Sequence, residues 1–187
     1  KIDPNKYKAI HKIGVSYQKL EDHDNAIIQF RKAIGVIEQN DEKFMSSYHS
    51  LGVSFMETGA YKDAIQILNE VITLSPQYYK AYETLGVLHI ESSDSRFTNY
   101  ELALEYLLEA SKIKSENYRL KFRLSQLYNM MAEEDKENEK YKPMNKNLAE
   151  AKKYARQCLK LKKTYGGAYF ELGVAELNLC NKATGIK

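Results

Sequence analysis

Apolar and small residues recur along this chain with the spacing of an α-helix. Within residues 48–65, Tyr48 is followed three residues later by Leu51, then by Gly52 and, after three more, by Phe55. Side chains spaced by three and four residues lie on one face of a helix. The alternation of period two that indicates strands is nearly absent. The pattern therefore predicts an all-α protein built from amphipathic helices.

The same pattern occurs five times. A second small residue follows in the first four units and marks a second helix. From Ala64 to Gly86, and again from Ala103 to Ser125, the interval is 22 residues. A fixed interval predicts a repeat array in which each helix hairpin buries its apolar face against the next one. Each unit contains an aliphatic residue followed directly by a small one: Ile13-Gly14, Leu51-Gly52, Leu85-Gly86, Leu124-Ser125 and Leu172-Gly173.

The interval between the two helices of a unit is not constant. It is 12 residues from Gly52 to Ala64, but 17 residues in the third unit and 26 in the fourth. Units three and four therefore carry insertions. In the fourth unit, either both helices are extended by about seven residues each or a charged, disordered loop joins them. Pro143 is expected in the first turn of the second helix, because proline suits that position.

These units resemble the tetratricopeptide repeat, a 34-residue helix-turn-helix unit with the pattern W-x2-L-G-x2-Y, then A-x3-F, then P. The resemblance covers nearly the whole chain and is weaker in the fourth unit, where Lys121 and Ser125 replace the aromatic residue and the glycine. It implies a right-handed superhelical solenoid of antiparallel helix hairpins, with the first helices lining a concave side. The second unit matches in Tyr48, Leu51, Gly52, Phe55, Ala64 and Pro76.

We predict a single domain over residues 1–187, with four full repeats and one unpaired C-terminal helix. Pro4 precedes Gly14 by ten residues, as Pro76 precedes Gly86, and the last unit lacks its second helix. We therefore expect a fragment of a longer array, with an apolar stripe on the last helix that is exposed or packed on another molecule. The predicted repeats cover residues 7–44, 45–78, 79–117, 118–165 and, in part, 166–187.

Composition and charge narrow the function classes. The chain has 28 basic and 25 acidic residues, and its net charge of +3 is too small to indicate a nucleic-acid partner. No apolar run approaches the roughly 18 residues that cross a bilayer, so this chain is not expected to insert into a membrane. The chain begins at Lys1, which leaves the compartment open: cytoplasmic, or periplasmic or membrane-anchored if a signal was removed.

No set of residues with catalytic or metal-binding spacing is present. The sequence has no glycine-rich phosphate loop and no serine nucleophile elbow. His11, His49 and Glu83 occupy one row of the repeat, but stacked helices lie about 8 to 10 Å apart, too far for shared metal ligands. Cys158 and Cys180 are expected as small helix residues rather than as a disulfide. We predict no enzyme activity in this chain, no metal and no cofactor.

The basic run of residues 152–165 has two interpretations. A solvated helix face is favoured, because Ala155 and Cys158 can point inward while the lysines point outward. The alternative is a surface for an acidic protein, a nucleic acid or a membrane. Self-association through the exposed C-terminal helix is a further option for a partner.

The resemblance implies a protein-interaction scaffold that holds a peptide or a helix of a partner in a concave groove. The alternative is a regulatory or substrate-recruiting part of a larger enzyme. The valines after the glycines are predicted to face this groove, although packing between adjacent first helices would also explain them. The predicted groove residues are Lys8, His11, Lys12, Val15, His49, Ser50, Val53, Met56, Lys80, Glu83, Thr84, Val87, Ile90, Arg119, Phe122, Arg123 and Gln126.

One subset of the family binds the C-terminal carboxylate of heat-shock chaperones through a clamp of lysine, asparagine and arginine side chains. Only Lys80 matches that clamp here, so binding of a chaperone tail is disfavoured. Arg119 and Arg123 are one helical turn apart and suited to hold an acidic group. The positions that correspond to the clamp are His11, Val15, Ser50, Lys80 and Thr84.

Overall fold

The computed structural model describes residues 5–38 and 44–183. Over these ranges the chain forms nine α-helices and no strand, which confirms the predicted all-α class. None of the helices in the described ranges combines the length and the apolarity needed to span a bilayer. Pro4, and residues 39–43 of the predicted first repeat, lie outside the described residues.

The chain divides into two compact units, residues 1–99 and 100–187, and each is described by itself. The third predicted repeat, residues 79–117, is divided between them. The first unit contains α1 (Asn5–Lys19), α2 (His23–Glu38), α3 (Met45–Glu57), α4 (Tyr61–Leu74) and α5 (Tyr79–Glu91). The second contains α6 (Tyr100–Ile113), α7 (Tyr118–Glu137), α8 (Tyr141–Leu161) and α9 (Gly166–Ala183).

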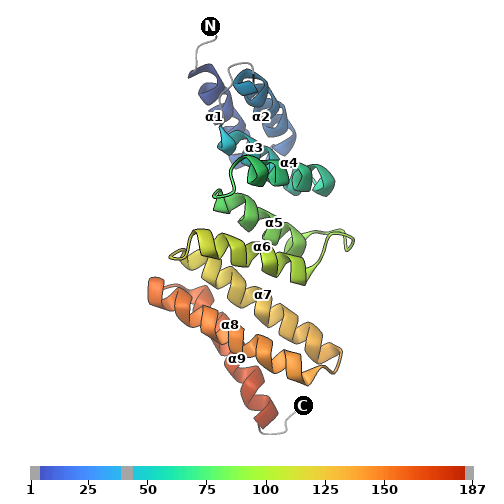
Figure 1. Cartoon of the computed structure of the whole chain (residues 1–187), viewed down its shortest axis with the longest axis vertical. Helices are drawn as coiled ribbons and strands as arrows, with labels where there is room; N and C mark the ends of the chain where they lie inside the picture. Colours follow the sequence, from blue (N-terminus) through green and yellow to red (C-terminus); the bar gives the residue numbers. More distant parts are fainter. Residues whose placement is uncertain (1–4, 39–43, 184–187) are drawn as a thin grey trace. The chain divides into compact units, whose positions relative to one another are not determined.

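Two hairpins form the N-terminal part of the first unit, where α1 packs against α2 and α3 against α4 (Figure 1). Their glycines lie where the helices cross most closely. A methyl group added to Gly14 would lie 2.6 Å from the ring of Phe30 in α2, and one on Gly52 would lie 2.7 Å from Leu68 in α4. No side chain fits in that space, so the helix crossing requires the small residue that the sequence pattern singles out.

The turns that end α1, α3 and α7 share one backbone geometry. Gly59 has a φ of 76°, and the equivalent residues Glu21 and Glu139 have φ values of 59° and 57°. After Gly59, the N–H of Ala60 donates to the carbonyl oxygen of Phe55 at 2.8 Å, the bond that closes a Schellman motif. Glycine adopts this left-handed conformation without strain, whereas glutamate does not. The same bond joins Asp22 N to Tyr17 O at 3.0 Å and Lys140 N to Asp135 O at 2.7 Å.

In the second unit, α7 and α8 form a longer hairpin (Figure 1). They have 20 and 21 residues, against 13 in α3 and 14 in α4, so each is longer by seven residues. The insertion in the fourth unit therefore extends both helices, one of the two alternatives that the sequence predicts, and Pro143 lies in the first turn of α8. The added turns share a core of Ala132, Met144 and Leu148, to which α9 contributes Ala175.

Candidate functional site

The first helices of the first unit carry most of the predicted groove residues. Helix α3 contacts both α1 and α5, so the three helices are neighbours. Spacings of three and four residues place the predicted residues of each helix on one face. Lysines on this face are exposed, and its apolar residues are half-buried. We define the first-helix surface as Lys8, Lys12, Val15, Val53, Met56, Lys80, Glu83 and Ile90.

Val87 differs from the other predicted valines of this face. Its side chain is only 7% exposed, whereas Val15 and Val53 are partly exposed. A side chain with so little exposure offers almost no surface to a ligand. Packing between helices, the alternative that the sequence left open, therefore describes Val87 better, and the first-helix surface excludes it.

The two histidines of the predicted groove connect neighbouring first helices. His11 Nδ1 lies 3.1 Å from the hydroxyl of Ser47, and His49 Nε2 lies 3.0 Å from the hydroxyl of Thr84. Burial lowers the pKa of both imidazoles; that of His49 falls to about 4, with the nearby charge of Lys80 as a second cause. Both rings are therefore neutral at pH 7. In the part of the chain that the structure describes, no three His, Cys, Asp or Glu side chains group as metal ligands.

Two further polar bridges between first helices were not predicted. Gln18 Nε2 donates to the carbonyl oxygen of Ser50 at 3.0 Å and to the hydroxyl of Ser54 at 2.9 Å. In the second unit, Asn129 Nδ2 donates to the carbonyl oxygen of Glu171 at 3.0 Å and to its Oε2 at 2.8 Å. Gln18 and Asn129 both stand four residues after the small residue of their helix, a column that is apolar in repeats two and three. Comparing that column across repeats would have revealed these two amides, but not their partners.

Phe122 of α7 is used for packing within the second unit. Its ring centroid lies 5.0 Å from that of Tyr165, and a methyl group added to Gly167 would lie 2.9 Å from the Phe122 ring. Phe122 is thus in contact with the turn between α8 and α9. Its predicted neighbours Arg123 and Gln126 are half-buried on the same helix.

The hydroxyl of Tyr118 receives two cationic donors at the start of α7. Arg119 Nε donates to it at 3.2 Å and Lys162 Nζ at 3.3 Å. These hydrogen bonds, that from Arg119 first, lower the pKa of Tyr118. The Arg119 side chain is exposed to solvent. Binding of an acidic group by Arg119 and Arg123 stays a prediction.

The basic run of residues 152–165 includes a solvated helix face, the interpretation that the sequence favours. Ala155 and Cys158 are buried, while the charged side chains of α8 lie outside the core. Lys152 and Arg156 form ion pairs with Glu176 of α9 at 3.0 and 3.3 Å. The hydrogen bond from Lys152 is the first cause of the lowered pKa of Glu176. Part of the basic charge is thus compensated within the unit.

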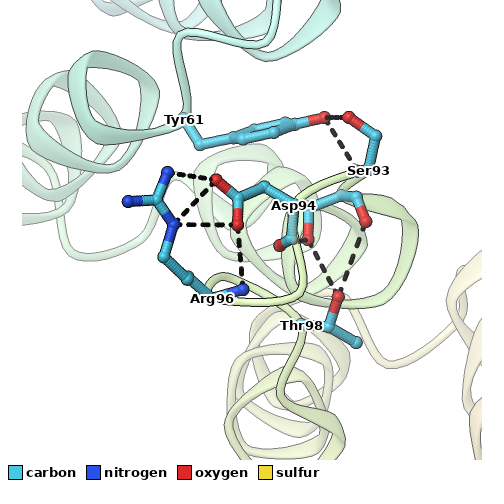
Figure 2. Close-up of polar contacts among 6 residues, drawn as sticks. Tyr61, Ser93, Asp94, Arg96 and Thr98 are labelled. Carbon is cyan, nitrogen blue, oxygen red and sulfur yellow. Dashed lines mark hydrogen bonds and ion pairs between the residues drawn. The ribbon is translucent and has the colours of Figure 1, made fainter.

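The insertion of the third repeat forms a hydrogen-bonded loop in the first unit (Figure 2). The hydroxyl of Tyr61, at the start of α4, accepts a hydrogen bond from the backbone N–H of Ser93 at 2.9 Å and lies 2.9 Å from the Ser93 hydroxyl. Within the loop, Arg96 and Asp94 form an ion pair at 2.6 Å. The contacts between Tyr61 and Ser93 connect the loop to the hairpin of α3 and α4, whereas the ion pair lies within the loop.

Comparison with known proteins assigns the first two hairpins to a family. The family model described as tetratricopeptide repeat matches residues 7–40 and 46–78, which cover these hairpins except for the first one or two residues of each. Heat shock protein STI1 of Saccharomyces cerevisiae (strain ATCC 204508 / S288c) is 33% identical over 93 residues. The matched part makes up 49% of this chain and only 15% of that protein, so the chain spans a small part of the length of this relative.

Solved structures extend the likeness to the rest of the chain. The crystal structure of MamA protein is similar with a TM-score of 0.68 and 18% identity, over 98% of this chain and 85% of that one. The C-terminal part of a TPR repeat-containing protein from Cytophaga hutchinsonii gives 0.68 and 17%, over 92% and 59%. At such identities the likeness shows the fold alone, and it confirms the predicted class of superhelical helix hairpins. Residues 7–40 and 46–78 are thus tetratricopeptide repeats, a class of protein-binding scaffold that is typically non-catalytic, and the rest of the chain shares the fold of the solved structures.

Proposed function

We propose that the protein is a scaffold whose first-helix surface binds an amphipathic segment of a partner protein. The observation that carries this proposal is the set of partly exposed apolar side chains on neighbouring first helices, among them Val15, Val53 and Met56. Apolar side chains that gather on an exposed face are typical of interaction sites. The lysines around them complete the apolar centre and polar rim of a protein interface.

Charge favours an acidic segment. The first-helix surface carries three exposed lysines, Lys8, Lys12 and Lys80, and one carboxylate, that of Glu83. His11 and His49 add no positive charge at pH 7, because burial lowers their pKa values. We expect the bound segment to place acidic residues beside apolar anchors. Because the lysines are solvated, they affect the association rate and its salt dependence more than the affinity.

The expected affinity is low. Burying one Val, Leu or Phe side chain of the partner contributes about 1.5 to 3 kcal/mol. Two or three such anchors contribute about 3 to 9 kcal/mol, of which the cost of association removes at least about 4 kcal/mol, so we expect a weak, reversible complex. A segment with one anchor, or with basic residues beside its anchors, should bind much more weakly.

Selection of random linear peptides displayed on phage tests the proposal. We expect the selected peptides to combine apolar and acidic residues and to lose binding to a chain that carries Val15→Glu and Val53→Glu. The matched control is Ile28→Glu on α2, a side chain that is 46% exposed and belongs to a second helix. Circular dichroism checks that both variants keep their helices. Peptides that bind the double variant as well as the unchanged chain would place the binding surface elsewhere.

A further inference from the structure

Helix α9 exposes a seam of residues with the spacing of a helix-helix contact. Gly166, Phe170, Gly173, Leu177 and Cys180 are all exposed. Their intervals alternate between four and three residues, the heptad spacing by which one helix packs along another. Phe170 is 70% exposed and Leu177 61% exposed, so the two large apolar side chains of the seam face solvent. Such a face fits a second helix.

The repeat pattern shows how this face differs from that of the other first helices. Gly14 and Gly52 meet Phe30 and Leu68 of the second helix in their own hairpins. Gly173 holds the same place in the repeat, yet a methyl group added to it would meet no atom within 4 Å. In the described part of the chain, no second helix covers α9 at this position. The close helix approach that glycine allows is therefore still available there.

We propose that α9 packs antiparallel against α9 of a second copy of this chain, with the two-fold axis near Ala175. In that register Gly173 faces Leu177 of the second copy, and Phe170 faces Cys180. Each layer then pairs a large side chain with a small one, so the two seams interdigitate. A parallel pair would instead place glycine against glycine and phenylalanine against phenylalanine, leaving a gap in one layer and crowding in the next. The antiparallel seam is complementary to itself, as a two-fold interface requires.

The size of the seam sets the strength of the contact. Helix α9 has 18 residues, which at 1.5 Å per residue make it about 27 Å long, and the seam from Gly166 to Cys180 covers most of that length. Tyr169, 56% exposed, borders it and adds apolar area. A contact of one helix with one helix lies at the small end of protein interfaces. We therefore expect a reversible dimer that forms in the micromolar range of concentration. None of the residues of the first-helix surface takes part in it.

Sedimentation of the 187-residue chain over a range of concentrations tests the proposal. We expect a monomer-dimer equilibrium, and Leu177→Glu should weaken it roughly tenfold to a hundredfold, because a carboxylate then replaces the largest aliphatic group of the seam. Leu20→Glu, at a side chain 75% exposed beyond the end of α1, is the matched control and should change nothing. Both residues are exposed in the single chain, so circular dichroism should show unchanged helix content. A chain that stays monomeric up to millimolar concentration overturns the proposal, and so does a dimer that Leu177→Glu leaves intact.

Crosslinking tests the register. Phe170→Cys should form an intermolecular disulfide with Cys180 of the second copy when two thiols are oxidised by diamide. The chain with both Phe170→Cys and Cys180→Ser should not crosslink, and neither should the unchanged chain, because the antiparallel register separates its two Cys180 residues by most of the seam. Cys158 is buried and should not react. An unchanged chain that forms a disulfide through Cys180 would show a parallel pair and overturn the antiparallel arrangement.

Discussion

Substitution of Gly52 by alanine tests why each repeat needs a small residue at the helix crossing. The added Cβ would lie 2.7 Å from Cγ and 2.9 Å from Cδ2 of Leu68, and 3.1 Å from Cγ2 of Ile67. Leu68 is fully buried, and its Cγ is the branch point of the side chain, so relief requires a shift of α4. Overpacking of this kind costs about 1 to 3 kcal/mol, against a gain of about 1 kcal/mol from replacing glycine within a helix. We expect a net loss of up to about 2 kcal/mol in the free energy of unfolding.

Gly173→Ala is the matched control for this change. Gly173 is also inside a helix, but no atom lies within 4 Å of its added Cβ, so the gain in helix propensity is unopposed. We expect stabilisation by about 1 kcal/mol at concentrations where the chain is monomeric. Urea unfolding followed by circular dichroism measures both variants, with the m-values compared because the chain has two compact units. Shifts of the same sign in the two variants would refute the crossing argument.

Three further changes test separate features. Glu21→Gly removes a left-handed glutamate with a φ of 59° and should stabilise the chain by about 1 kcal/mol in urea unfolding; a loss of stability would contradict the strain. Tyr61→Phe removes the hydrogen bonds to Ser93, so amide hydrogen exchange in residues 92–99 should become faster, and an unchanged rate would show that the loop does not depend on them. Because the pKa of His49 is about 4 in the folded chain and the ordinary histidine pKa is 6.5, the unfolded chain binds more protons between these two values. Stability should therefore fall as the pH drops through that window, and His49→Gln should flatten the urea midpoint plotted against pH.

The helices and their hairpins could be predicted because their signals are local. A small residue such as Gly52 marks a close crossing wherever it occurs at helical spacing between apolar residues, and the structure places Leu68 directly against it. The longer interval of the fourth unit likewise predicted the added turns of α7 and α8 as one of two alternatives. The spacing of apolar residues along the sequence thus indicates which face of a helix is apolar.

The exposure and the hydrogen bonds of the candidate-site residues were harder to predict, because both depend on the neighbouring helices. Val15, Val53 and Val87 follow glycine in the same way, yet only Val87 is buried, since the extent of burial is set by the surrounding helices. The bridges made by Gln18 and Asn129 depend on backbone carbonyl groups of another helix, which carry no sequence signal. The spacing of apolar residues predicts which face of a helix a side chain lies on. How far neighbouring helices cover that side chain, and which groups it hydrogen-bonds, depends on how the helices pack.

Amide hydrogen exchange of the chain with and without a selected peptide tests most directly whether the first helices form the binding surface. We predict added protection in α1 and α3, whose exposed faces carry Val15 and Val53, with α2 and α4 unchanged. Added protection confined to α2 and α4 would show that the partner binds the second helices and would contradict the proposed scaffold surface.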